Sequence, residues 1–355
     1  MSDLHPRARE ESRDDTELSH PLAERLGIVP LSLPTPFAIG PITTWLLTDG
    51  PLTLIDTGLA SAEALHVLDR RMADAGHRVE DLEAIVLTHE HADHVGLSSI
   101  LAERSGAAVI AIDALAGRLA DPAGYGLRET TFMVESLQRH GIQRELTVTL
   151  GGMQLGHRAW AGGPVTVTDP VASGSVRSLG GLDFEIVLRP GHSVTDTLLI
   201  NHEHGLVFGG DHLLAHVSSN PLMACSPEKL DPRRPQAPGP DDRVPALCHY
   251  IDGLEATAQL DPAVVLGGHG PAVTDARSVV SDRLRMHDRR KRKILGLLDE
   301  DGSPAFAIAR RMWGDIAWKQ PLLCVSEVLG HFDLLREDGS ARPETHDGVE
   351  RWYAV

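Results

Sequence analysis

Four residues that can bind a metal ion lie within six positions of the sequence. His89, His91, Asp93 and His94 form the pattern HxHxDH in the segment Thr88–His94. Neutral imidazole and carboxylate oxygens are, together with thiolate, the ligands that Zn²⁺ prefers in proteins. Alternate side chains of an extended turn point to the same side, so His89 and His91 can bind one ion. Asp93 and His94 begin the next predicted helix and can face a second ion.

Three further polar residues follow predicted strands and are flanked by glycine. They are His192, Asp211 and His269, and they come in this order after the histidine cluster. Glycine at such positions lets the backbone approach a crowded centre closely. A single histidine in a turn is more often structural, but the complete series of seven residues favours a shared metal site. Glu90 points the opposite way from its neighbours in the extended turn and is interpreted as a solvated spacer.

The elements that must position these residues alternate between strand and helix. Strands are predicted at residues 42–48, 52–56, 84–88, 107–112, 184–188, 197–201, 206–208 and 263–266, and helices at 61–75, 97–104, 127–140 and 244–259. This alternation is typical of an α/β layered domain. The candidate ligands follow strand ends, which is where α/β folds place ligand-binding groups.

The remaining segments divide the chain into further parts. Residues 1–24 are polar and are expected to form a flexible tail. Residues 114–178 interrupt the alternation, contain a Gly-rich stretch at 151–163, and are interpreted as an insert near the mouth of the site. Residues 276–355 are predicted to be mostly helical. The basic run 289–293 either meets an anionic part of a substrate or lies on a solvated helix face.

Composition narrows the class of function. The 355 residues include 33 Lys and Arg against 50 Asp and Glu, a net charge of −17, which argues against binding of a nucleic-acid backbone. Three widely spaced cysteines exclude a disulfide framework. No apolar run approaches 18 residues, so no membrane span is expected. The first residues lack an apolar segment, so we expect no signal peptide and a cytoplasmic location.

The seven-residue series resembles the motif of the metallo-β-lactamase-fold hydrolase superfamily, over roughly residues 28–275. This resemblance implies a four-layer αβ/βα sandwich with the metal site at one edge and a catalytic domain at 25–275. By position, it implies that His89, His91 and His192 bind a first metal, that Asp93, His94 and His269 bind a second, and that Asp211 bridges them. Asp56, in a segment that matches an early motif of the family, would support the site without binding metal.

Three further segments resemble the glyoxalase II-like and lactamase-like branch of that superfamily. Residues 210–214 and 219–221 match the region after the bridging aspartate, which makes His212, His216 and Asn220 candidates for the substrate pocket. Residues 326–332 resemble the small winged-helix-like tail of this branch. The C-terminal segment 276–355 is therefore expected to be such an appendage.

The ligand set predicts the chemistry of a dinuclear hydrolase. Two Zn²⁺ ions, with Fe or Mn as alternatives, would hold a bridging hydroxide as the nucleophile. Asp211 would bridge the ions, and Asp93 would orient the nucleophile and accept its proton. The expected substrate is a small ester-like compound, namely a thioester, a lactone or a related acyl compound.

Three other functions are weighed against this one. A metal-dependent ribonuclease or phosphodiesterase would use the same ligands. The separation of 58 positions between Asp211 and His269 leaves no room, however, for the extra domain of the large nucleases in the family. A β-lactamase would normally require export. A non-catalytic binding module would show a degenerate ligand set. We therefore expect a small-molecule substrate and no DNA or membrane partner, while RNA binding and a homodimer stay open.

Overall fold

The computed structural model describes residues 18–355, and residues 1–17 of the predicted tail lie outside the described residues. Helix α1 (Pro21–Arg25) occupies residues that sequence analysis assigns to that tail. Its proline suits the first helical turn, and the His20 side chain accepts a hydrogen bond from the backbone N–H of Leu22. Ala23 is buried in the main core, so residues 21–24 belong to the folded domain.

The first sheet contains six strands of the described chain. In spatial order they are β1 (Ile28–Leu33), β2 (Ile42–Leu47), β3 (Thr53–Ile55), β4 (Ala84–Leu87), β5 (Ala108–Ile112) and β6 (Asp169–Val171). The first three are antiparallel to one another, and β3 to β6 are parallel. β4 is an uninterrupted apolar run that is buried along its length, as expected of a parallel strand covered on both faces.

The second sheet packs against the first. Its spatial order is β11 (Val264–Gly267), β10 (Leu206–Gly210), β9 (Thr197–Asn201), β8 (Leu182–Leu188) and β7 (Ser175–Leu179). One core joins the two sheets, because Leu54 and Ile85 of the first belong to the same buried cluster as Phe184 and Phe208 of the second.

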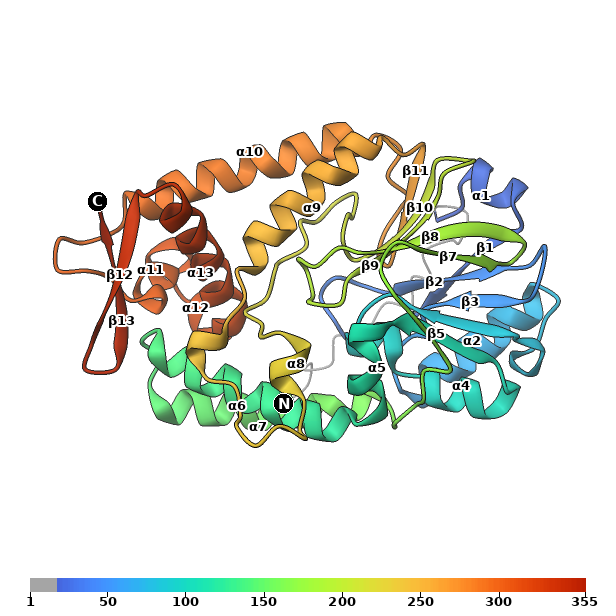
Figure 1. The fold of residues 1–355 in the computed structure, drawn as a ribbon, viewed down its shortest axis with the longest axis horizontal. Helices are drawn as coiled ribbons and strands as arrows, with labels where there is room; N and C mark the ends of the chain where they lie inside the picture. Colours follow the sequence, from blue (N-terminus) through green and yellow to red (C-terminus); the bar gives the residue numbers. More distant parts are fainter. Residues whose placement is uncertain (1–17) are drawn as a thin grey trace, which may run out of the picture.

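Helices cover the outer faces of both sheets, which completes the predicted four layers (Figure 1). The helices α2 (Ala62–Asp74) and α4 (Ser98–Ser105) pack on the first sheet through Leu68 and Leu101. The helices α9 (Ala246–Leu260) and α10 (Ala276–Leu295) pack on the second through Leu254 and Val280.

The segment predicted as an insert is helical for most of its length. It contains α5 (Asp113–Ala120), α6 (Pro122–Arg139) and α7 (Arg144–His157), and it ends with β6 and the start of β7. The sequence pattern predicts no helix for the Gly-rich stretch, yet α7 continues through Gly151, Gly152 and Gly156. A methyl group on Gly151 would lie 2.9 Å from Val134 Cγ2, so this glycine allows α7 to pack closely on α6.

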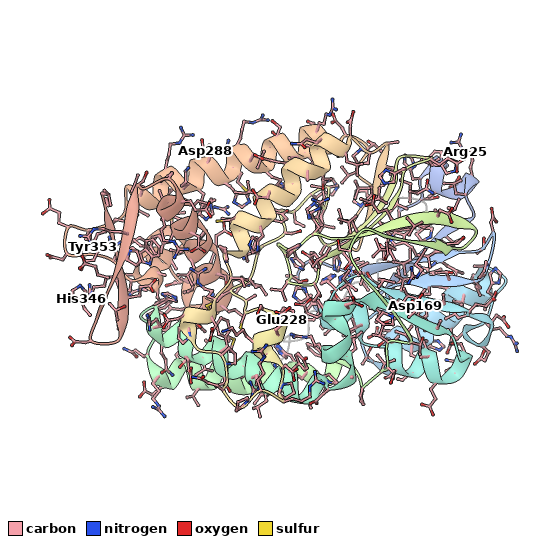
Figure 2. All side chains as sticks on the ribbon, viewed as in Figure 1. Arg25, Asp169, Glu228, Asp288, His346 and Tyr353 are labelled. Carbon is pink, nitrogen blue, oxygen red and sulfur yellow. The ribbon has the colours of Figure 1, made fainter. Side chains whose placement is uncertain are left out.

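The C-terminal part extends away from the sandwich along α10 (Figure 1). It contains α11 (Ala305–Trp313), α12 (Ile316–Lys319), α13 (Pro321–Glu337) and the hairpin of β12 (Ala341–His346) and β13 (Val349–Ala354). Figure 2 places His346 and Tyr353 of this hairpin at the opposite end from Asp169 of the sandwich, with Glu228 between them. Over residues 18–355, no helix has the length and apolar character that crossing a membrane requires.

Candidate metal centre

The histidine cluster lies on the turn that joins β4 to the short helix α3 (Ala92–Val95). His91 is the N-cap residue of this helix, and Asp93 and His94 lie within it, as the sequence predicts. The other three candidate ligands come from the second sheet. His192 lies in the turn after β8, Asp211 directly follows β10, and His269 lies two residues after β11.

Three imidazole nitrogens converge in a first group. His91 Nδ1 lies 3.1 Å from His89 Nε2 and 2.8 Å from His192 Nε2. Burial, together with the neighbouring histidines, lowers the pKa of His192 to about 3 and holds that of His89 well below its ordinary value. The rings of His89 and His192 are therefore neutral at pH 7 and retain the nitrogen lone pairs that a metal ion requires.

Asp93, His94 and His269 form a second group of potential ligands. His269 Nε2 lies 3.3 Å from Asp93 Oδ2, and both residues are buried. Burial opposes ionisation of Asp93, but the neighbouring imidazoles of His269 and His94 hold its pKa below the ordinary value. Asp93 is therefore an ionised carboxylate at neutral pH.

Asp211 lies between the two groups. Its Oδ1 is 3.5 Å from His94 Nε2, and its Oδ2 is 3.6 Å from both His192 Nε2 and His269 Nε2. Burial raises the pKa of this carboxyl, but the surrounding imidazoles, His269 first, hold it well below the ordinary value. One carboxylate thus faces ligands of both groups.

Buried atoms without hydrogen-bond partners show that this set fits a cation. Among the described residues, His94 Nε2, His269 Nε2 and Asp211 Oδ1 are buried and make no hydrogen bond. His94 directs its Nδ1 to Asp56 Oδ2 at 2.7 Å, and His269 directs its Nδ1 to the carbonyl oxygen of Pro41 at 2.9 Å. Burial opposes protonation of both rings, but neighbouring carboxylates raise the pKa of His94 and of His269. The contacts to Asp56 and Pro41 hold a proton on each Nδ1, so Nε2 is the atom that would give up its proton to a metal ion.

Glycine is required at two of the strand ends. A methyl group on Gly268 would lie 2.6 Å from Asp211 Oδ1. Gly210 has a φ of +47°, and a methyl group on it would lie 2.9 Å from Thr88 Oγ1. Larger residues at either position would push the ligands apart. The flanking glycines in the sequence therefore have the close-approach role that we predicted for them.

The three candidate pocket residues occupy different environments. His212 is buried and directs its Nε2 to Thr257 Oγ1 at 2.9 Å, which places it inside the protein. His216 is exposed. The side-chain amide of Asn220 lies 3.4 Å from the carbonyl oxygen of Leu323 in α13. The structure therefore does not bring these three side chains together.

Two other polar features differ from the sequence-based expectation. Glu90, predicted to be a solvated spacer, instead accepts a hydrogen bond from the Thr195 hydroxyl, because the turn bends at His91 to enter α3. In the basic run, Arg290 pairs with Glu327, Lys291 with Asp338, and Arg292 with Asp288. These three cations are thus engaged within the chain, which favours the helix-face interpretation.

Comparison with known proteins agrees with this geometry. A sequence model of the metallo-beta-lactamase superfamily matches residues 38–269. A probable metallo-hydrolase of Bacillus subtilis strain 168 is 29% identical, over 88% of this chain and 92% of its own length. An atrochrysone carboxyl ACP thioesterase of a Cryptosporiopsis species is 23% identical, over 54% of this chain and 58% of its own. The crystal structure of a metallo-beta-lactamase family protein from Thermus thermophilus superimposes with a TM-score of 0.75 at 24% identity, over 93% of this chain and 99% of its own.

Proposed function

The chain belongs to the metallo-β-lactamase superfamily and is a metal-dependent hydrolase, and we propose that it uses two zinc ions to hydrolyse a small thioester or a related ester. The observation that carries this proposal is the position of Asp211, whose two oxygens face His94 on one side and His192 and His269 on the other. One tetrahedral zinc ion takes about four ligands, so seven candidate ligands are more than a single ion would use.

The residues of the chain have separable roles in this reaction. His89, His91 and His192 would hold one ion, Asp93, His94 and His269 the other, and Asp211 both. When bound, such ions act as Lewis acids and lower the pKa of water. Asp93 remains ionised, so its Oδ2 can accept a proton from the attacking water molecule. Asp56 fixes the orientation and tautomer of His94.

Two considerations favour an acyl substrate. The similar fungal protein is named a thioesterase, which supports a thioester more than a β-lactam. The net charge of −17 disfavours a polyanionic nucleic acid as substrate. We propose that the protein acts in the cytoplasm.

The test is a hydrolysis panel with zinc-loaded full-length protein. The panel contains a thioester, a lactone, a β-lactam and a phosphodiester, and metal content is measured on the same preparation. We expect close to two equivalents of metal and the highest kcat/KM for the thioester or the lactone. One equivalent that added Zn²⁺ does not change would contradict the dinuclear site, and a preference for the phosphodiester would overturn the substrate class.

A further inference from the structure

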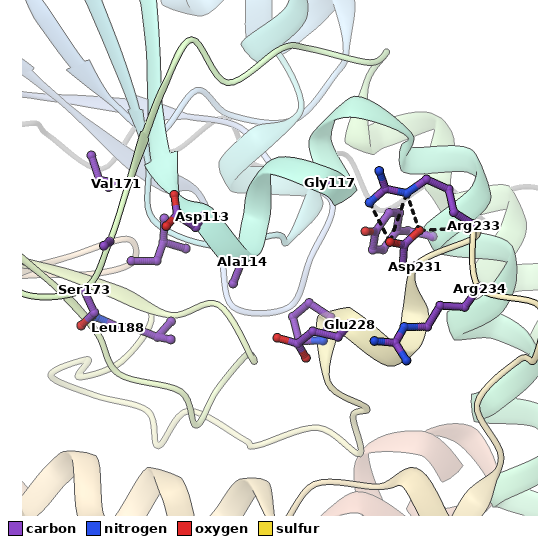
Figure 3. Close-up of a pocket in the computed structure, with 14 residues that line it drawn as sticks. Asp113, Ala114, Gly117, Val171, Ser173, Leu188, Glu228, Asp231, Arg233 and Arg234 are labelled. Atoms are coloured by element: carbon purple, nitrogen blue, oxygen red, sulfur yellow. Dashed lines mark hydrogen bonds and ion pairs between the residues drawn. The ribbon is translucent and has the colours of Figure 1, made fainter.

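A cavity of about 510 Å³ lies beside the metal centre and has no role in the site described above. Figure 3 shows it between α5, the chain at Val171–Ser173, the end of β8, and the loop that contains α8 (Pro227–Leu230). Its volume falls within the range of small-molecule sites, about 300–1,000 Å³.

Strand register places this cavity on the same sheet edge as the metal ligands. In the parallel pair of β4 and β5, Leu87 lies opposite Ala111. His89 and the cavity-lining Asp113 each follow two residues later, so they lie at the same end of the two strands. In the other sheet, the cavity-lining Leu188 ends β8 only four residues before His192. The cavity is therefore adjacent to the metal centre on its β5 and β8 side.

Helix α5 connects the two sites. Its Ala114 and Gly117 line the cavity, and the next residue, Arg118, interacts electrostatically with Glu90, which lies between two of the histidine ligands. Helix α5 therefore lies close to both the cavity and the turn of His89 and His91.

The lining determines which part of an ester fits there. The cavity is lined by the aliphatic side chains of Ile112 and Val171 from the first sheet, Leu188 from the second, and Ala114 from α5. These side chains can remove an alkyl chain from water, and each buried methylene then contributes about fourfold to binding, the equivalent of about 0.8 kcal/mol.

The charges on the cavity disfavour a polyanionic leaving group. Asp113, Glu228 and Asp231 supply three carboxylates against the two guanidinium groups of Arg233 and Arg234. Arg233 is engaged with Asp231 at 2.7 Å, as the dashed lines in Figure 3 show. Phosphates of a carrier group would therefore meet a net negative wall, whereas a neutral acyl chain would not.

We propose that this cavity binds the acyl chain of the substrate and selects neutral acyl groups of medium length. The proposal rests on the proposed ester hydrolysis and assigns to this cavity of the protein the choice between acyl groups. Kinetics with thioesters that share one leaving group and differ only in acyl length, from acetyl to octanoyl, provide the first measurement. We expect kcat/KM to rise with chain length until the cavity is filled.

Two substitutions that fill the cavity from different elements test its role. Ala114→Phe on α5 and Ala172→Phe beside Val171 should each lower kcat/KM for the octanoyl thioester at least tenfold and leave the acetyl thioester within twofold. Ala120→Phe is the matched control, because Ala120 lies on the same helix, is exposed, and does not line the cavity. An equal loss for both substrates, or no loss for either, would overturn the proposal.

A binding measurement separates this proposal from the proposed function. Calorimetric titration with octanamide, a neutral compound that does not require catalysis, should show binding to the wild type that is at least tenfold weaker in Ala114→Phe. Equal affinity in the two proteins would refute the acyl site. Octanamide could bind as expected while the zinc-loaded wild type hydrolyses no ester. That result would overturn the proposed function, but it would still support a site for neutral acyl compounds in the cavity.

Discussion

Replacing Asp56 with asparagine should weaken metal binding without unfolding the chain. Asp56 Oδ1 accepts the backbone N–H of Thr88 at 2.9 Å, and Oδ2 accepts the Thr88 hydroxyl at 2.8 Å and the Nδ1–H of His94 at 2.7 Å. All three residues are buried. Asp56 has a φ of +59°, and asparagine adopts this left-handed conformation as readily as aspartate. The backbone at this position therefore tolerates the change.

The expected effect follows from the number of acceptor atoms. Asparagine has one acceptor oxygen where aspartate has two. If that oxygen keeps the Thr88 N–H, the amide nitrogen faces His94 Nδ1, which can then only accept a hydrogen bond. The ring proton moves to Nε2, the atom that lies 3.5 Å from Asp211 Oδ1, and blocks it as a ligand. Loss of such supporting partners lowers metal affinity about 10- to 100-fold, or about 1.4–2.7 kcal/mol.

The assay is competition with a chelator of known affinity, using the wild type, Asp56→Asn and Asp74→Asn. Asp74 is an exposed residue at the end of α2, so its substitution controls for the loss of one negative charge. We expect weaker zinc binding only in Asp56→Asn, with ester hydrolysis reduced in parallel and the metal-free melting temperature within a few degrees. Unchanged zinc affinity in this variant would refute the tautomer argument.

Three further predictions concern metal, catalysis and stability. A chelator should lower the melting temperature, because an ion at 100 times its Kd adds about 2.7 kcal/mol to the stability; identical melting curves would contradict a native metal site. Asp211→Ala should lower the hydrolysis rate at least about 100-fold, or about 2.7 kcal/mol, whereas the exposed His216→Ala should stay within about twofold; similar losses would show that Asp211 does not have the bridging role. Arg243→Gln leaves the fully buried Asp333 carboxylate with only its 3.1 Å contact to Arg336, and it should cost about 3 kcal/mol in urea unfolding, the lower end of the range for a broken buried pair. The exposed Arg233→Gln should leave the urea midpoint nearly unchanged, and equal losses of stability in the two variants would contradict the role of burial.

The sequence predicts the convergence of the seven ligand candidates because their positions depend on strand ends. His89, Asp211 and His269 each follow a short apolar run, and such runs form the strands β4, β10 and β11. Parallel strands β10 and β11 bring their carboxyl ends to one edge, so residues 58 positions apart meet at 3.6 Å. The glycines beside them signal the same crowding that the structure contains.

Other features depend on contacts that no local pattern encodes. The inward direction of Glu90 depends on Thr195, a residue 105 positions later in the chain. The helical state of the Gly-rich stretch depends on packing against Val134 of α6, which offsets the low helix propensity of glycine. The ion pair of Arg243 with Asp333 joins a loop to α13 across 90 positions. In each case the partner, rather than the residue itself, determines the outcome.

The same distinction separates chemistry from specificity in this molecule. The candidate metal ligands lie at strand ends, where the sheets fix their positions and the sequence pattern can identify them. The proposed acyl cavity instead combines Ala114 at the start of the predicted insert, Leu188 of the second sheet, and Glu228 in the loop before α9. Segments of this kind tolerate changes in length and composition more readily than strand ends do. Substitutions at these three positions should therefore change which ester is hydrolysed while metal content stays constant.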